Sequence, residues 1–274
     1  VLSVFRDTPA EAAGVLVGDV IAAVEEWRVE GEDAVSEISS RVRGPVGTDV
    51  SITLRAPDGE EREVTITRAK IDLRPSVEFR QVEGSIGYLR IPALTEDLVA
   101  EASKALPQLL STRYLLLDLR NVSSGTIDGV TQVAQWFLGS AGLGGFVSRE
   151  GGMQLPYRED AIAAFQRPLA ILVNSNTYGV GEMLAKMLRD YKRGPIVGNK
   201  TQGGFQIGKS VDLPSGGRRR MTIGRYVSPS SELLPMDGIS PDVTVEIPDL
   251  EVVREGRDVY IEAAVEAVRS NLRL

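Results

Sequence analysis

From residue 86 onward, apolar strand-like runs alternate with helix-like segments, and this alternation most constrains the fold. The runs predicted as strands are Ile86–Ile91, Tyr114–Leu119, Leu169–Val173 and Pro195–Gly198. The segments predicted as helices are Glu96–Leu110, Asp128–Leu138 and Gly181–Leu188, with a closing amphipathic helix over Val259–Leu272. Because parallel strands need crossover connections, the alternation predicts a mostly parallel sheet with crossover helices.

The first 68 residues have a different pattern, in which short apolar runs alternate with turn signals. Four apolar runs are predicted as strands: Val1–Phe5, Val20–Val24, Val50–Leu54 and Val64–Ile66. Pro57-Asp58-Gly59 is a good hairpin turn between the last two. Ala34–Val42 has helical spacing. The pattern predicts a small β-rich domain with one helix.

These patterns give a mixed α/β fold class and four segments. We expect a β-rich domain over 1–70, a linker over 71–84 that contains Pro75, an α/β core over 85–248, and a C-terminal helical segment over 249–274. The glycines between Gly142 and Gly152 match no phosphate-binding spacing, and we interpret them as a mobile loop.

Composition excludes several kinds of site. The chain has no cysteine and no histidine, which removes disulfides and every catalytic triad that contains either residue. Net charge is −7, and Arg218-Arg219-Arg220 is too short for a nucleic-acid footprint. No apolar stretch is long enough to span a bilayer. Asp118 and Asp128 could suggest paired carboxylates, but Asp118 lies on a buried-type strand, which favours a structural role. We expect no metal, cofactor or nucleic acid.

The segment Thr8–Ile21, with the sequence TPAEAAGVLVGDVI, resembles the PDZ signature. Gly14 suits the left-handed position after a short helix, and Gly18 suits a tight turn before a strand. The resemblance starts late, because the strand and loop that capture a peptide carboxylate normally precede the part that matches Val1–Phe5. Since a PDZ domain binds its ligand as an added strand, we expect weak binding or a groove filled by another segment.

Three later segments together resemble the core of the carboxyl-terminal (tail-specific) processing proteases. Ile86–Ile91 and Leu117–Asn121 are similar to the family's "IGYIRI" and "LDLRNNPGG", and Ile171–Glu182 is similar to "VLVNxxTASASE". Met221–Ser230 and Asp237–Asp242 are similar to "TTARYYTPSG" and "GIxPD". The resemblance implies a PDZ-like domain followed by a crotonase-like α/β core, and a serine nucleophile activated by a neutral lysine that a glutamine orients.

Glycine stands at all three of these functional positions. Aligning Glu182 with the glutamate of "SASE" places the nucleophile at Gly179, the lysine of "TFGKG" at Gly204 and the glutamine at Gly208. Leu213 and Gly216 support this alignment without gaps, since they fall on the Leu and Gly of the family's "LxDG". Because glycine has no side chain that attacks or accepts a proton, we expect no catalytic residue there.

The segment at the family's oxyanion-loop position differs from the family pattern, and nearby serine, threonine and lysine residues could replace the missing pair. Ser124 and Gly125 lie where the family has "NNPGG", so Ser124 puts the turn geometry in doubt. A relocated dyad would pair Ser175 or Thr177 with Lys200 or Lys209. We favour ordinary roles for these four, since serine and threonine after a strand usually cap the next helix and exposed lysines are usually solvated.

The leading functional hypothesis is a non-catalytic homologue, or pseudoprotease, that acts as a scaffold, adaptor or regulatory subunit. Its partners would be proteins or peptides, including an active relative or a larger assembly. One alternative is an active serine endopeptidase with a relocated Ser/Thr-Lys dyad. A second is an apolar-ligand carrier, since photoreceptor retinoid-binding proteins resemble this core and lack the catalytic pair. The resemblance also implies an extracytoplasmic location: periplasm, envelope or lumen.

Overall fold

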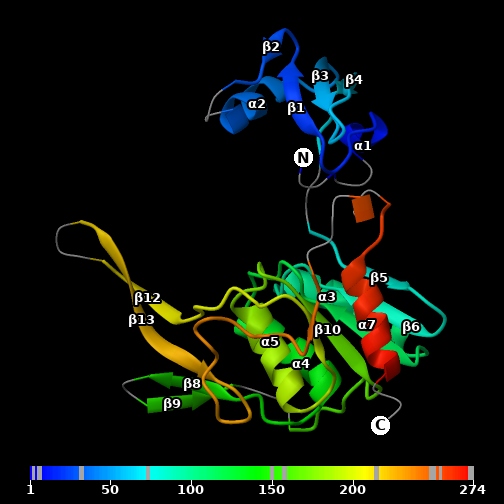
Figure 1. Cartoon of the computed structure of the whole chain (residues 1–274). Helices are drawn as coiled ribbons and strands as arrows, with labels where there is room; N and C mark the ends of the chain where they lie inside the picture. Colours follow the sequence, from blue (N-terminus) through cyan, green and yellow to red (C-terminus); the bar gives the residue numbers. More distant parts are fainter. Residues whose placement is uncertain are drawn as a thin grey trace. The chain divides into compact units, whose positions relative to one another are not determined.

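The computed structural model describes residues 1, 4, 8–30, 34–71, 75–148, 151–155, 159–212, 216–246, 251–252 and 255–270. The chain forms two compact units (Figure 1). The first comprises residues 1–74 with 248–257, and the second comprises residues 75–247 with 258–274. Among the described residues, no helix has the length and apolar character needed to cross a membrane.

Over residues 8–30 and 34–71, the first unit is a small antiparallel sheet with two helices. Its elements are α1 (Pro9–Ala12), β1 (Val20–Val24), β2 (Trp27–Arg28), α2 (Ala34–Val42), β3 (Asp49–Arg55) and β4 (Glu61–Thr67). The strand order is β2-β1-β3-β4. Alternate residues of β3, namely Val50, Ile52 and Leu54, are buried, as expected for a strand with one face on a core. The described residues therefore confirm the β-rich prediction and the hairpin turn; Leu2, Ser3 and Phe5 lie outside them.

Glycine conformation in this unit agrees with the sequence interpretation. Thr8 caps α1, because its Oγ1 accepts a hydrogen bond from Glu11 N at 3.4 Å. Gly14 follows the end of α1 with a φ of +77°, and Gly18 precedes β1 with a φ of +87°. Both angles lie in the left-handed region that glycine adopts without a steric penalty.

The second unit is built on a six-stranded sheet in the order β14-β11-β10-β7-β6-β5. Its strands are β5 (Glu78–Gln81), β6 (Ile86–Arg90), β7 (Tyr114–Asp118), β10 (Leu169–Val173), β11 (Ile196–Gly198) and β14 (Val243–Thr244). Every pairing is parallel except β5 with β6, which confirms the predicted sheet. The predicted linker over 71–84 is wrong in part, because β5 lies within it and pairs with β6.

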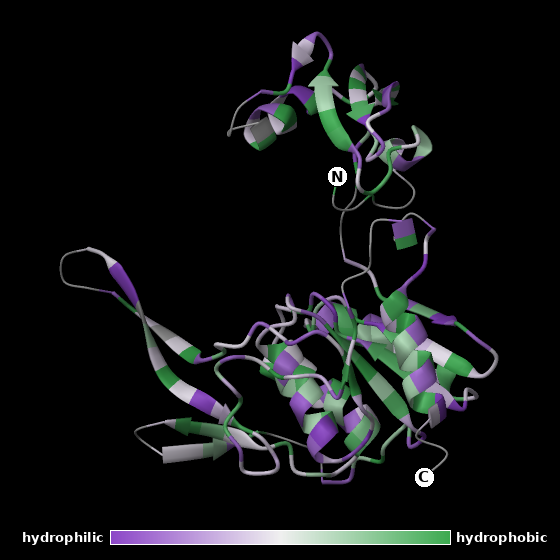
Figure 2. Cartoon of the chain, viewed as in Figure 1, coloured by the Kyte–Doolittle hydropathy of each residue, from purple (hydrophilic) through white to green (hydrophobic). Residues whose placement is uncertain are grey.

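Helices cover both faces of this sheet (Figure 1). The helices α3 (Glu96–Leu109), α4 (Ile127–Leu138) and α5 (Val180–Asp190) share the larger core with one set of strand residues. The alternate strand residues, such as Tyr88 and Leu172, pack with α7 (Val259–Ser270) on the other face. Figure 2 shows hydrophobic residues concentrated along the central strands. A separate C-terminal segment over 249–274 is therefore not observed, since α7 belongs to the second unit.

A second sheet of this unit has the order β12-β13-β8-β9. Its strands are β8 (Gly145–Ser148), β9 (Gly151–Gln154), β12 (Ile207–Asp212) and β13 (Arg218–Val227), and all pairings are antiparallel. The prediction of a mobile loop over Gly142–Gly152 is wrong, because β8 and β9 form a hairpin there. A Cβ on Gly145 would lie 2.3 Å from the Met153 carbonyl oxygen, so glycine permits the close approach of these strands.

Candidate functional site

Gly179 lies in the turn between β10 and α5. It is the N-cap of α5, with φ +59° and ψ −111°, and it is buried. A strand, a sharp turn at positive φ and a helix N-terminus form the arrangement in which several hydrolases present a nucleophile. Glycine adopts this φ easily. The residue that the alignment placed at the nucleophile position therefore has the backbone of such a turn and no side chain.

Glu182 joins this turn to the segment that precedes Gly204. Its buried carboxylate accepts hydrogen bonds from Gly179 N at 3.0 Å, from Gly203 N at 2.9 Å and from the Thr201 hydroxyl. A carboxylate only accepts hydrogen bonds, and each of these three groups donates one. The structure thus brings the segments of Gly179 and Gly204 together through the glutamate on which the alignment was anchored.

Gly204 and Gly208 stand at the positions aligned with the family's lysine and glutamine, so neither position has a side chain. Gly204 has a φ of +79°, and a Cβ built on it would have no heavy atom within 4 Å. Gly208 lies in β12, opposite Thr222 of β13. Gly204 lies in the segment between β11 and β12, whereas Gly208 is part of β12. In the described residues, neither position holds a group that could accept a proton from a nucleophile.

Phe205 occupies the space beside the nucleophile position, and sequence analysis missed it. A Cβ built on Gly179 would lie 3.1 Å from Phe205 Cδ2 and 3.3 Å from Cε2. The Phe205 ring also packs edge-to-face on Tyr178, with the ring centroids 6.0 Å apart. The ungapped alignment could have indicated this residue, because it places the large Phe205 at the second glycine of "TFGKG".

Hydrogen bonds fix the turn in the loop after β7. Asn121, at φ +62°, accepts hydrogen bonds through Oδ1 from the side-chain amides of Asn174 and Asn176, each at 3.0 Å. The Ser124 carbonyl accepts a hydrogen bond from Leu94 N at 2.9 Å. Ser124 does not have a positive φ, so the serine causes no left-handed strain there.

Gly125 is the constrained glycine of this loop. It has a φ of +155°, and a Cβ on it would lie 2.7 Å from the Leu94 carbonyl oxygen. Residue 125 therefore cannot carry a side chain without moving the Leu94 backbone.

The relocated-dyad candidates do not form a dyad in the described residues. Thr177 is fully buried; its Oγ1 donates to the Leu119 carbonyl at 2.9 Å and accepts from Asn174 N at 3.0 Å. Thr177 does not cap α5 as expected, because Gly179 is the N-cap. Ser175 is exposed. Lys200 pairs with Asp237 at 2.6 Å, and this hydrogen bond lowers the pKa of Asp237. The Lys209 side chain and Leu213 lie outside the described part.

A different serine and lysine lie within hydrogen-bonding reach. The Nζ of Lys186, on α5, is 3.2 Å from Ser230 Oγ, which is 3.0 Å from Ser228 Oγ. Lys186 also forms ion pairs with Asp190 and, at 2.8 Å, with Glu232. An ammonium group paired with two carboxylates has no lone pair with which to deprotonate a serine. The cluster is therefore an ion-pair network in which Lys186 and Asp190 are buried and Glu232 is mostly exposed. The sequence indicated only one part of this network, because Lys186 and Asp190 are four residues apart, a spacing that allows an ion pair on a helix.

Asp190 is the acidic centre of this network. Burial opposes its ionisation, but hydrogen bonds from Lys186, Ser228 and Ser230 outweigh burial and lower the pKa of Asp190. The ionised carboxylate fixes the loop that follows β13 against α5.

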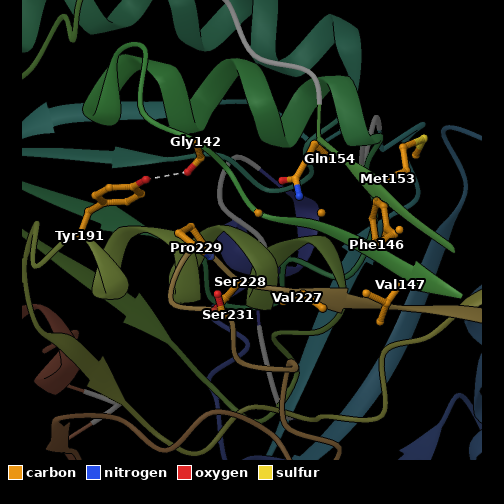
Figure 3. A pocket seen from close by; sticks show the side chains of 13 residues that line it. Gly142, Phe146, Val147, Met153, Gln154, Tyr191, Val227, Ser228, Pro229 and Ser231 are labelled. Carbon is orange, nitrogen blue, oxygen red and sulfur yellow. Dashed lines mark hydrogen bonds between the residues drawn. The ribbon is translucent and has the colours of Figure 1, made fainter.

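A cavity of about 250 Å³ lies beside this network (Figure 3). Ser228 and Ser231 line it on one side, and Phe146 and Gln154 line it on the other. The Tyr191 hydroxyl closes one end by donating to the Gly142 carbonyl at 2.8 Å. None of the described lining residues is charged. The cavity thus holds no nucleophile–base pair and no acidic residue for a metal.

Asp118 has the structural role that the sequence favoured. It is fully buried, accepts a hydrogen bond from the Tyr88 hydroxyl at 2.7 Å and pairs with Arg120. Arg120 also pairs with Asp258 at 2.8 Å and lies over the Tyr260 ring, which connects the end of β7 to α7. Burial, followed by the charge of Asp118, raises the pKa of Tyr88. The described residues contain no cluster of three or more acidic side chains able to hold a metal ion.

The comparisons with known proteins agree on one family. The model for "Peptidase family S41" matches residues 85–245. The chain is 31% identical to a carboxy-terminal-processing protease of Bartonella bacilliformis, covering 95% of this chain and 61% of that protein. It is 29% identical to a carboxyl-terminal-processing protease of Synechocystis, covering 100% of this chain and 66% of that protein.

Solved structures give the same result. A photosystem II D1 C-terminal processing protease is 30% identical, with a TM-score of 0.58 over 95% of this chain and 73% of that one. An S41 protease from Bacteroides fragilis, 17% identical with a TM-score of 0.61, shares the fold over 89% of this chain and 70% of that one. The fold and these matches define a chain of the S41 peptidase type, and the chain belongs to peptidase family S41. It spans about three fifths of the length of the curated relatives it matches.

Proposed function

We propose that this chain is a catalytically inactive member of family S41 that binds protein or peptide partners without cleaving them. One observation carries the proposal: the nucleophile-type turn before α5 holds Gly179, at φ +59°, instead of a serine. Gly204 and Gly208 support it, since neither can supply the base or its orienting group.

Phe205 gives independent support. Its ring stands against Gly179, so that a β-carbon on residue 179 would lie 3.1 Å from Phe205 Cδ2. A serine at residue 179 would therefore be crowded by this ring, and we infer that restoring the serine alone does not rebuild the site.

The partner is proposed to be polypeptide. The first unit is PDZ-like, and it contains an apolar cavity of about 430 Å³ between α2 and the strands, lined among others by Ile21, Ile38 and Val42. PDZ domains bind extended peptide ends, and this unit is proposed to do so as part of a scaffold, adaptor or regulatory subunit. An extracytoplasmic location is part of the proposal, by analogy with the processing proteases.

The test measures binding and cleavage in the same samples. The chain is titrated into a labelled unfolded protein with an apolar C-terminus to measure binding, and the masses of both proteins are then determined by intact-mass spectrometry. Saturable binding with unchanged masses supports the proposal. Binding with new fragments would contradict the loss of catalysis, and no binding would contradict the partner role.

A further inference from the structure

Strands β12 and β13 form a two-stranded ribbon over residues 207–212 and 218–224, and this ribbon extends away from the helical layers of its unit (Figure 1). Among the described residues, this part of β13 pairs with β12 alone, and β12 pairs with no other strand. Hydrophilic and hydrophobic residues both occur along the ribbon (Figure 2). The partner that the ribbon fits therefore depends on which side chains share a face.

One face of the ribbon carries apolar and cationic side chains together. In the antiparallel register Val211 lies opposite Arg219, and Met221 lies two residues from Arg219 on the same face. Val211 is 40% exposed, Met221 is 50% exposed, and Arg219 is exposed as well. Ile207, at the base of this face, packs against the core. We call the exposed residues Val211, Arg219 and Met221 the outer patch.

The acidic residue of the ribbon lies on the other face. Asp212 lies opposite Arg218, and their side chains form an ion pair at 2.9 Å in which the two charges offset each other. Because successive residues of a strand point to opposite faces, this pair lies behind the outer patch. Residues 205–227 contain five cationic residues and one acidic residue, whereas the whole chain has a net charge of −7. The outer patch is thus an apolar and cationic place on an acidic protein.

This combination selects the kind of partner. Val211 and Arg219 are direct cross-strand neighbours, so the partner must offer an apolar phase and negative charge side by side. The surface of an anionic bilayer does so over its whole area, because its phosphates attract arginine and its acyl chains receive apolar side chains. Duplex nucleic acid offers phosphates without an apolar layer beside them. A peptide would have to match the ribbon in register, whereas a bilayer needs no register.

We propose that the outer patch docks this protein on a membrane surface rich in anionic phospholipid. Val211 and Met221 enter the interfacial region, and Arg219 reaches the lipid phosphates. The ribbon stays in the hydrated head-group region, because unpaired backbone groups at its strand edges do not enter the hydrocarbon core. The acidic remainder of the chain is repelled by the same surface, so contact is made through the projecting ribbon. This docking goes beyond the proposed function and does not depend on it.

Vesicle co-sedimentation with the whole chain measures the docking. Vesicles of phosphatidylcholine alone are compared with vesicles in which about a third of the lipid is phosphatidylglycerol. The partition coefficient should be about tenfold or more higher on the anionic vesicles and should fall as the salt concentration rises. Equal partition onto both kinds of vesicle, or binding to neither, would overturn the inference.

Two substitutions test the two components of the outer patch. Arg219→Glu should lower the partition coefficient about tenfold or more, since each cation near an anionic surface contributes about fivefold and the substitution reverses the charge. Met221→Ser should lower it about threefold or more. Arg113→Glu, at an exposed arginine outside the ribbon, and Met153→Ser, at a 63% exposed methionine of β9, should leave it unchanged. Thermal unfolding checks that each variant is folded, and equal losses in patch and control variants would overturn the inference.

Insertion of the outer patch can be followed without any loss of binding. The chain has no cysteine, so a single introduced cysteine can carry a fluorophore that responds to an apolar environment. The fluorophore on Met221→Cys should show stronger, blue-shifted emission on anionic vesicles, whereas the same fluorophore on Met153→Cys should not change. No change at residue 221, or equal changes at both residues, would overturn the inference.

Soluble polyanions distinguish the other possible partners. Duplex DNA and polyglutamate are titrated into the wild-type chain, Arg219→Glu and Met221→Ser. Binding as tight as that to anionic vesicles, with the same dependence on both residues, would assign the outer patch to a soluble polyanion and overturn the inference. Weaker binding that does not depend on Met221 supports the membrane surface. Cleavage of a protein substrate would contradict the proposed function and leave this inference unchanged, so the two fail separately.

Discussion

The Phe205 ring lies against Gly179, so that a β-carbon on residue 179 would stand 3.1 Å from Phe205 Cδ2. Such a contact is shorter than most, and Phe205 is also held by Tyr178. The turn before α5 therefore has no side chain at residue 179 and has an aromatic ring beside it. Under the proposed function, we expect a working nucleophile to need changes at both residues.

Gly179→Ser should lower the free energy of unfolding by about 1–3 kcal/mol, because a serine there takes a positive φ and also meets Phe205. Gly204→Ser is the matched control: it takes a positive φ in open space and pays only the backbone cost. Urea unfolding measures both. Adding Phe205→Ala to Gly179→Ser should remove the steric part, and equal costs for the two single variants would contradict the contact.

Glu182→Gln should destabilise the chain by roughly 2–4 kcal/mol. Glutamine has one acceptor oxygen, and its amide donors would face the N–H groups of Gly179 and Gly203, which now donate to the carboxylate. Glu232→Gln, at a mostly exposed carboxylate, should cost much less. Chemical denaturation compares the two, and a similar small effect for both would show that the Glu182 junction contributes little.

Asp190 gives an acid-dependent stability. Since its pKa is lowered on folding, its contribution is present above the unfolded pKa, near 4, and is lost as the pH falls through the lower folded value. Asp190→Asn should therefore be less stable than wild type at neutral pH and should show a smaller loss of stability below about pH 4. Unfolding curves at several pH values test this, and parallel pH profiles for the two proteins would contradict it.

Arg120→Met should loosen α7. The substitution leaves the fully buried Asp118 without its cation, which typically costs about 3–5 kcal/mol, and it removes the ion pair to Asp258. Asp258→Asn removes only the more exposed partner and should cost less than half as much. Amide hydrogen exchange should show faster exchange in α7 for Arg120→Met. Unchanged protection of α7 would contradict the anchoring role of this network.

Most of the central fold could be predicted from the sequence because its strands are buried on both faces. Runs such as Leu169–Val173 are apolar throughout, and the helices between them have regular spacing. The edge strand β5 was missed because all four of its residues are exposed, so it carries no apolar pattern. The hairpin of β8 and β9 was missed because it is rich in glycine, which is typical of a loop in sequence, whereas Gly145 here permits a close backbone approach between the strands.

Of the candidate site, the sequence predicted only the three positions at which glycine stands. Alignment on Glu182 placed Gly179, Gly204 and Gly208, and the structure joins the first two segments through that glutamate. The contact of Phe205 with Gly179 and the network around Lys186 depend on residues far apart in sequence, 26 and up to 46 positions. The spacing of residues in helices and strands does not predict contacts between residues so far apart in the sequence. The assignment of these positions as lost catalytic residues stays a prediction.

Whether the chain cleaves protein is measured by incubating it in excess with an unstructured protein that has an apolar C-terminus and recording intact masses over many hours. We expect the substrate to stay intact with the wild-type chain and with Ser175→Ala, Thr177→Ala and Ser230→Ala alike. Fragments that form with the wild-type chain and disappear in one of these variants would contradict the proposed loss of catalysis and would identify the nucleophile.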